Sequence, residues 1–177
     1  KILKKWKKTT IKDDHGAKIF DEIEKFIDFV NIPDNTDKYK RNVGGCFNLY
    51  EPIPYRPVKG EWKKTEYFLN HIFGEYYDVG LDYLQLMHSK PTQNLPILCL
   101  VSKIQNTGKS TFLRWLNFIY GDNAVILGNE DFSSNFNAHW INKLVIGVDE
   151  TSIEKKVLKE KIKRLATDDS ALQENKG

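Results

Sequence analysis

The sequence predicts an α/β fold in which a parallel β-sheet carries a ligand site at one edge, and three observations support this. Residues 96–101 form a short apolar run that suits a strand buried on both faces of such a sheet. A mostly polar turn and a helical pattern that begins near Gly108 follow directly. A second apolar strand, residues 143–148, ends in the adjacent carboxylates Asp149 and Glu150. Because the carboxyl ends of parallel strands open on one edge, these features are expected to meet there.

The turn after the first strand has the residues of a phosphate-binding loop, or P-loop. Strand, loop, Gly-Lys-Ser and helix follow one another in the order that such a loop needs. Gly108 would let the backbone close around the β-phosphate, the cation of Lys109 would reach the β- and γ-phosphates, and the Ser110 hydroxyl would ligate Mg²⁺. Backbone N–H groups at the helix start, with the helix dipole, would add to the anion site. The predicted nucleotide-binding residues are Asn106, Thr107, Gly108, Lys109, Ser110 and Thr111, and the predicted cofactors are ATP and Mg²⁺.

Two residues depart from the usual pattern G-x-x-x-x-G-K-[ST]. Lys103 stands where the first glycine is expected, either in an ordinary β conformation or as an added charge beside the nucleotide. Asn106 stands where a further glycine is often seen, and asparagine is the non-glycine residue that best tolerates a left-handed backbone. Because G-K-S-T alone occurs by chance in many proteins, the prediction depends on the strand before it and the helix after it.

The carboxylates after the second strand predict the other half of the site. Asp149 would hold Mg²⁺, through a water, and Glu150 would orient and deprotonate the attacking water. These roles fit hydrolysis better than transfer of a phosphoryl group to a small molecule. The alternative interpretation of Asp149 and Glu150 is an ordinary exposed acidic turn without a catalytic role. The predicted catalytic residues are Lys109 and Glu150, and the predicted metal ligands are Ser110 and Asp149.

Composition limits the class of protein. A length of 177 residues with 40% apolar residues indicates a folded domain, or one domain with a smaller appendage. No apolar run approaches a membrane span, and there is no signal peptide, so we expect a protein without a membrane partner. Cys46 and Cys99 form neither a disulfide framework nor a zinc pattern, which favours a reducing, cytoplasmic setting. Because the chain starts at Lys1 and ends without a closing element, we expect a fragment of a longer protein.

The chain is predicted to have three parts. They are an N-terminal mixed or helical segment with its connector (1–60), a helical lead-in (61–94), and the P-loop core (95–177), truncated at its C-terminal end. Residues 1–12 are basic and are read as a nucleic-acid contact, a frayed end or an edge strand. The other predicted elements are helices at 17–30, 65–74 (with Thr65 as N-cap), 79–88 and 153–166, strands at 46–50 and 124–127, and an irregular connector at 51–60.

The motif Asn106-Thr107-Gly108-Lys109-Ser110 resembles the superfamily 3 helicases of small DNA viruses, such as the papillomavirus and parvovirus replication proteins. It is similar above all to the primase-helicases of phages and bacterial mobile elements, which are related to the poxvirus primase-helicase. The resemblance covers roughly residues 47–177. Three further stretches contribute to it, namely Asn48-Leu49-Tyr50-Glu51-Pro52, His71-Ile72-Phe73-Gly74 and Leu95-Pro96-Ile97-Leu98.

The resemblance implies the ATPase motor of a replicative DNA helicase in a bacterial or phage-infected cell. It implies that Lys109 binds phosphate, that Ser110 and Asp149 serve Mg²⁺, and that Glu150 is the catalytic carboxylate. It also implies a homo-oligomeric ring, usually a hexamer, whose basic hairpin grips single-stranded DNA, with Lys176 as part of that hairpin. The sensor asparagine and the arginine finger of the family would lie after Gly177.

Other readings of the sequence stay open. The basic helix at 153–166 offers Lys163 and its neighbours as DNA contacts, but a solvated helix face explains each lysine equally well. A nucleotide-binding module that assembles without hydrolysis is an alternative function, because Lys103 replaces the expected glycine. A P-loop kinase is less favoured, because Glu150 suits hydrolysis and no acceptor motif is recognisable.

Overall fold

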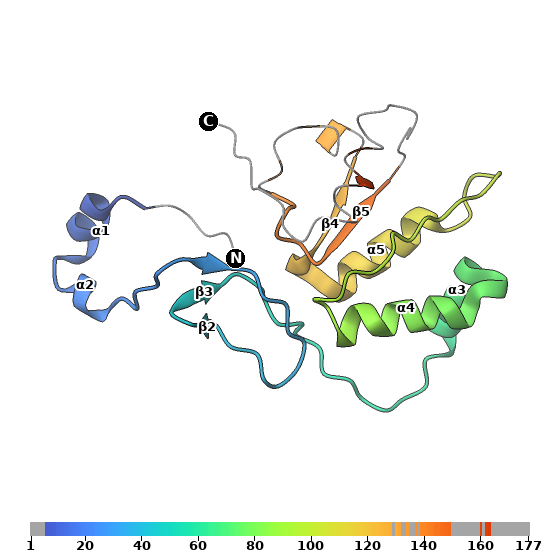
Figure 1. Cartoon of the computed structure of the whole chain (residues 1–177), viewed down its shortest axis with the longest axis horizontal. Helices are drawn as coiled ribbons and strands as arrows, with labels where there is room; N and C mark the ends of the chain where they lie inside the picture. The colour runs from blue at the N-terminus through green and yellow to red at the C-terminus, as the bar shows by residue number, and fades with distance from the viewer. Residues whose placement is uncertain are drawn as a thin grey trace.

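The computed structural model describes residues 6–128, 130, 131, 134, 137, 139–149, 160, 162 and 163. Its main body combines a pair of helices, a third helix and a small parallel sheet, and a second small sheet joins it from the N-terminal segment (Figure 1). The elements in chain order are α1 (Lys8–His15), α2 (Ile19–Glu22), β1 (Phe29–Val30), β2 (Asn42–Val43), β3 (Cys46–Asn48), α3 (Lys63–Phe73), η1 (Gly74–Tyr76), α4 (Tyr77–Ser89), α5 (Lys109–Tyr120), η2 (Gly121–Asn123), β4 (Ala124–Leu127) and β5 (Val145–Val148).

Helices α3 and α4 confirm the two predicted helices of the lead-in. The apolar side chains of each recur at helical spacing, which gives it one face for packing. The two helices are joined by η1, and Gly74, at a φ of 55°, ends α3 in a backbone conformation that favours glycine. The N-cap of α3 is Trp62, three residues before the predicted N-cap Thr65, so the predicted cap was wrong.

Helix α5 and the strands β4 and β5 confirm the helix and the strands predicted after the loop. β4 and β5 pair in parallel, with Ala124 opposite Val145 and Leu127 opposite Val148. The short turn η2 reverses the chain between α5 and β4, so that the strands run back along the helix. Figure 1 shows that the C-terminal ends of both strands lie on the side where α5 begins.

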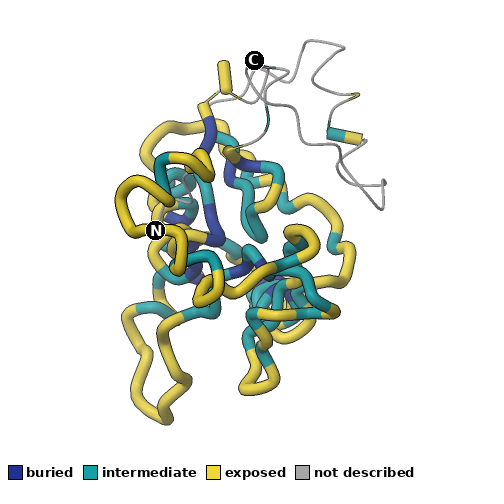
Figure 2. The backbone as a smooth tube through the Cα atoms, turned by 90° about the vertical axis from the view of Figure 1, so that its left-hand side faces the viewer, coloured by how far each residue is buried: buried dark blue, intermediate teal, exposed yellow. Residues whose placement is uncertain are grey.

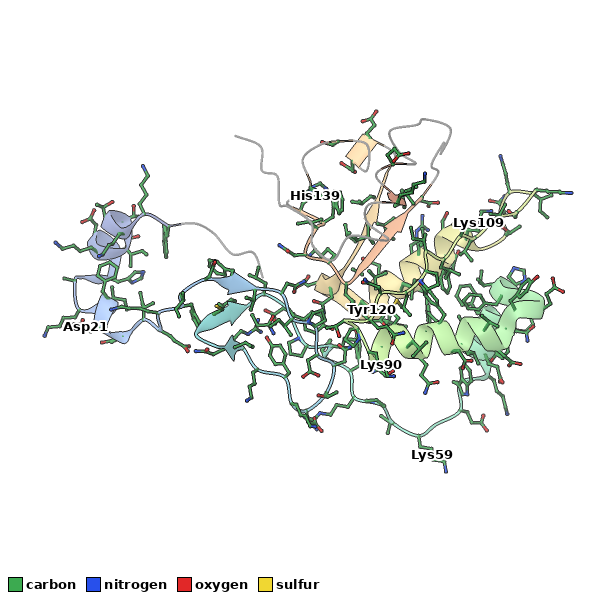
Figure 3. The ribbon with its side chains drawn as sticks, in the orientation of Figure 1. Asp21, Lys59, Lys90, Lys109, Tyr120 and His139 are labelled. Carbon is green, nitrogen blue, oxygen red and sulfur yellow. The ribbon has the colours of Figure 1, made fainter. Side chains whose placement is uncertain are left out.

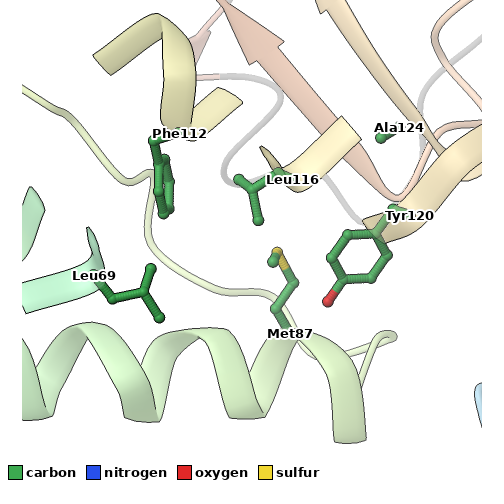
Figure 4. Packing of buried hydrophobic residues seen from close by; sticks show 6 residues of the cluster. All are labelled: Leu69, Met87, Phe112, Leu116, Tyr120 and Ala124. Atoms are coloured by element: carbon green, nitrogen blue, oxygen red, sulfur yellow. The ribbon is translucent and has the colours of Figure 1, made fainter. Parts of the chain in front are cut away.

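The hydrophobic core lies where α5 meets α3 and α4. Phe112, Leu116 and Tyr120 recur every four residues of α5 and are buried against Leu69 of α3 and Met87 of α4 (Figure 4). Burial is concentrated in this region, whereas the connector and the N-terminal segment are largely exposed (Figure 2). A second buried cluster, formed by Leu127 and Trp140, lies on the sheet.

The N-terminal segment differs from the prediction of one helix at 17–30. Only Ile19–Glu22 is helical, and the chain after it is extended. The backbone from residue 27 onward pairs with the region of β3: Ile27 N–H donates to Gly45 O at 2.9 Å and Leu49 N–H donates to Val30 O at 2.7 Å. The helical spacing of the apolar residues was misleading, because β-branched and aromatic residues suit a strand equally well once a partner strand is present.

The resulting small sheet has the order β1-β3-β2, with β1 parallel and β2 antiparallel to β3. The strand predicted at 46–50 is confirmed as β3, and the turn before it uses Gly44 and Gly45. The basic start of the chain contains α1, rather than an edge strand, in its described part. The stretch from 51 to 60 has no helix or strand, as predicted.

Side-chain amides join the N-terminal segment to the main body. Asn123, in η2, accepts a hydrogen bond from Glu51 N–H at 3.3 Å and donates one to Glu51 O at 2.5 Å. Asn35 donates to His88 O at 2.9 Å, and Asn31 donates to Asn142 O at 2.8 Å. The connector therefore leaves the main body from a point fixed by Asn123. None of the helices among the described residues has both the length and the apolar character that a membrane crossing requires.

Candidate functional site

The segment that leads into the predicted P-loop is extended but is not a strand. Leu98 and Leu100 are half-buried and pack on the main core, whereas Ile97, Cys99 and Val101 are exposed, Val101 by 90%. The prediction of a strand at 96–101 buried on both faces, with Cys99 inside it, was therefore wrong. In the described part of the chain, β4 pairs only with β5, and the segment lies instead along the helices, where Tyr83 Oη donates to Pro96 O at 3.0 Å. An apolar run reports burial of side chains, but it does not specify a partner strand.

The backbone of the loop takes the conformation that its sequence suggests. Asn106 has a φ of 58° and is the only non-glycine residue with a positive φ in the described ranges. Gly108 is the N-cap of α5, with φ 87° and ψ 2°, and its carbonyl accepts the hydrogen bond from Phe112 N–H at 2.9 Å. A Cβ atom at Gly108 would also lie 3.2 Å from Ile72 Cδ1. Both the left-handed backbone and the close approach of α3 explain the glycine immediately before Lys109.

Lys109 is the first residue of α5, and its amine folds back over the loop. The amine donates to Ser102 Oγ and, at 3.0 Å, to Thr107 Oγ1. Thr107 Oγ1 also donates to Ser102 Oγ at 3.1 Å, and Ser102 Oγ donates to Ile104 O at 2.7 Å. An ammonium has three N–H donors, so one remains for a further acceptor. Sequence reasoning missed Ser102; its only signal was a hydroxyl seven residues before the lysine.

A cavity of about 630 Å³ opens beside this lysine. One wall is the end of α3 with η1, residues 71–76; the other is the extended segment 98–102 together with Thr107 and Lys109. His71 also approaches the loop, since a Cβ atom at Gly108 would lie 4.0 Å from its Nε2. The size is that of a small-molecule site. Chemically, the cavity can hold an anionic group beside Lys109 and an apolar or aromatic group against its apolar side chains, and Glu75 also lines it.

Asp149 lies at the same end of the molecule as the loop. It follows β5 directly, is half-buried, and continues the strand pairing through its N–H, which donates to Leu127 O at 3.1 Å. A Cβ atom at Gly147 would lie 3.0 Å from Leu113 Cδ2, so the end of β5 packs on the first turns of α5. Lys109 begins that helix (Figure 3). The end of β5, with Asp149, therefore packs near the helix that begins with Lys109 and Ser110, and Glu150 lies outside the described residues.

The predicted metal ligands are compatible with Mg²⁺ bound together with phosphate. Ser110 is half-buried in the first turn of α5, and Asp149 offers carboxylate oxygens, which are donors that Mg²⁺ accepts. Among the residues that the structure describes, no group of three or more His, Cys, Asp or Glu side chains could hold a metal ion. Because Mg²⁺ commonly uses only one or two protein ligands plus phosphate oxygens, a hydroxyl and one carboxylate would suffice beside a nucleotide.

The two predicted DNA-binding lysines have different outcomes. Lys163 is described, is exposed, and its Nζ lies 3.6 Å from Glu160 Oε1. Lys176 lies outside the described residues, as does most of the predicted basic helix at 153–166. The geometry of a DNA-gripping hairpin therefore stays a prediction.

Comparison with known families gives one match. Residues 100–177, which include the loop, α5, β4 and β5, are similar to DUF5906, described as a family of unknown function. No curated protein and no solved structure matches the chain. The match begins at the end of the extended segment, so it includes the loop residues from Ser102 to Ser110.

Proposed function

We propose that this chain is part of the ATP-hydrolysing motor of a replicative DNA helicase of the primase-helicase type. The fold would be a P-loop NTPase core, and the full protein would act on single-stranded DNA as a homo-oligomeric ring. The arrangement of Lys109 carries this proposal. Its amine lies over a loop whose backbone is left-handed at Asn106 and Gly108, at the start of a helix, and beside a cavity of about 630 Å³.

The geometry supports a nucleotide more than a simple anion. A free phosphate would need only the loop, but the cavity beside Lys109 is also lined by apolar side chains, among them Ile72, Phe73 and Leu98. Such a space suits a ligand with charged phosphates at one end and an aromatic base at the other. Asp149, at the end of β5, supplies the carboxylate that magnesium bound to those phosphates requires.

The chain's own residues have defined tasks in this proposal. Lys109 would exchange its contacts with Ser102 and Thr107 for phosphate oxygens, which carry full negative charge and bind an ammonium more strongly than hydroxyls do. Asp149 would orient the metal, which supplies charge stabilisation when it is bound, and Glu150 would orient and deprotonate the attacking water. A non-hydrolysing assembly module would use only the binding of the phosphates by Lys109.

Nucleotide binding is tested by calorimetric titration of ATP with Mg²⁺. The Lys109→Ala variant is expected to lose at least tenfold in affinity, because the charge-assisted contacts to the phosphates disappear. Lys59→Ala is the matched control, since Lys59 lies on the connector, away from the loop (Figure 3), and the same charge is removed. Unchanged affinity in Lys109→Ala would contradict the proposed site.

Hydrolysis is tested on the full-length protein, by ATP turnover with and without single-stranded DNA. The motor requires turnover that DNA stimulates, and Glu150→Gln should bind ATP but not cleave it. Binding without turnover would favour the assembly module. Turnover that depends on a small-molecule acceptor would favour a kinase.

A further inference from the structure

An exposed pair of stacked aromatic rings lies on the outer side of α5. Tyr55 comes from the connector and Phe118 from α5, with ring centroids 6.0 Å apart and an angle of 26° between the ring planes. Tyr55 is 55% and Phe118 is 70% exposed. The rings hold each other in place, and the remaining ring surfaces face solvent. What sets this pair apart from the other exposed apolar side chains is that the two rings stack on each other and so form one continuous apolar surface.

Two arginines lie close to the rings in sequence. Arg56 follows Tyr55 in the chain, and Arg114 lies one helical turn before Phe118, on the same face of α5. Both are exposed, and within the described ranges neither forms an ion pair. Glu51 and Glu61, the acids nearest to Arg56 in sequence, are paired with Arg41 at 2.7 Å and with Lys63 at 3.3 Å, and Asp122 follows Phe118 by four residues. Close to the rings in sequence, the two arginines therefore outnumber Asp122.

We propose that Tyr55 and Phe118, with Arg56 and Arg114, form a stacking surface for the bases of single-stranded DNA. Aromatic side chains bordered by cations are the combination that binds single strands: the rings stack on bases, and the cations contact phosphates. Stacking tolerates any sequence, because every base has a π-face. This surface is separate from the loop at Lys109, and only the choice of DNA as the occupant rests on the proposed function.

A second copy of the chain fits this surface less well. Two identical patches meeting about a twofold axis would bring four arginines into one interface. Glu51 and Glu61, the acids nearest to Arg56 in sequence, already have partners. A polyanion neutralises both arginines at once, so the charge favours nucleic acid.

The test measures binding of a fluorescent thymidylate oligonucleotide, about a dozen nucleotides long, to the chain by anisotropy. ATP is absent, so that failure of the nucleotide site cannot affect the result. Phe118→Ala and Tyr55→Ala are each expected to weaken binding by roughly five- to tenfold, through loss of one stacking contact. Tyr67→Ala, which removes an exposed tyrosine of α3 outside the patch, is the control and should bind like the wild type.

Two further variants separate stacking from a general loss of apolar surface. Phe118→Trp should keep the affinity, and Phe118→Leu should lose it, although leucine retains much of the apolar surface and both variants should fold. Arg114→Ala should lower the slope of log K against log salt by about 1, because one phosphate contact is lost. Equal binding by Phe118→Ala and wild type would overturn the proposal. It would also be overturned if sedimentation showed self-association that Phe118→Ala abolishes while DNA binding stays unchanged.

Discussion

At the scale of single residues, the loop and the helix hairpin depend on glycines for two different reasons. Position 108 requires glycine because the backbone there, just before Lys109, is left-handed. Position 80 requires glycine for a steric reason. It lies inside α4, where the backbone has an ordinary conformation, but an added Cβ would overlap the ring of Phe73. That ring is itself held by Phe112, with centroids 5.5 Å apart. Gly80 therefore brings α4 close to the end of α3, and so to the wall of the cavity.

Gly80→Ala is expected to destabilise the protein by about 1–3 kcal/mol, because overpacking forces the Phe73 ring or the helix to shift. Alanine is otherwise the better helix former by about 1 kcal/mol, so a loss would show that the clash outweighs propensity. The free energy of unfolding from urea titration measures this. Gly60→Ala is the control, because nothing lies within 4 Å of that position, and it should be neutral or slightly stabilising. A Gly80→Ala variant as stable as wild type would contradict the packing at Phe73.

Protonation of buried tyrosines is a second property set at single residues. Burial raises the pKa of Tyr120 to about 12. Burial is also the main reason that the pKa of Tyr50 is raised to about 12. The folded state therefore keeps both phenol protons at a pH where the unfolded chain, with ordinary tyrosine pKa values near 10, has begun to lose them. By linkage, this contribution to stability is complete below pH 10 and is lost as the pH rises toward 12.

Tyr120→Phe tests this linkage. The variant should have a shallower loss of unfolding free energy between about pH 10 and 12, because one fewer proton is released on unfolding. Urea titrations at pH 8, 10 and 11 would measure the slope, and Tyr67→Phe, which alters an exposed tyrosine, is the control. Parallel slopes for Tyr120→Phe and wild type would mean that Tyr120 is not shielded from solvent as the structure has it.

At the scale of elements, α5 has three distinct faces. Phe112, Leu116 and Tyr120 face the helix hairpin, Leu113 contacts β5 at Gly147, and Arg114 and Phe118 face outward. One helix therefore connects the cavity, the sheet and the proposed stacking surface. Helix α5 begins with Lys109 at the loop. At its other end, Asn123 follows in η2 and attaches the connector.

Asn123→Ala should loosen that attachment. Its amide both accepts from and donates to the backbone of Glu51, and Asn123 is only 7% exposed. Removing it leaves backbone groups without partners, at a cost of about 1–3 kcal/mol. Limited proteolysis in the connector should become faster, because residues 52–60 would lose their fixed starting point. The matched control is Asn117→Ala, an exposed asparagine of α5, which should be cleaved at the wild-type rate.

At the scale of the whole molecule, the described residues form two small sheets and a helical core. The N-terminal sheet β1-β3-β2 is attached mainly through amide hydrogen bonds, whereas β4 and β5 pack directly on α5. The candidate site uses only the second part: the helix hairpin, the loop and the end of β5. The two walls of its cavity, residues 71–76 and 98–102, come from segments more than 20 residues apart in sequence, so a ligand bound there would link their stabilities.

Binding of ATP with Mg²⁺ should therefore stabilise the whole fold. At a ligand concentration of 100 times the dissociation constant, linkage predicts about 2.7 kcal/mol of added unfolding free energy. A thermal melt with and without the nucleotide would show this as a higher midpoint, and Lys109→Ala should show no such rise. An equal rise in Lys109→Ala and in wild type would place the nucleotide elsewhere.

The sequence alone was sufficient to predict α3, α4, α5, β4 and β5, because each has a clear apolar period bounded by turn residues. It also placed Asn106 and Gly108 in the loop correctly, because few residue types adopt a left-handed backbone. Only the tertiary structure decided that residues 96–101 lie along the helices, that residues 27–30 pair with the β3 region, and that Ser102 holds Lys109. The physical reason is that strand pairing and side-chain hydrogen bonds need a partner that is distant in the chain. Periodicity reports which side chains are buried, but not which backbone or hydroxyl they meet.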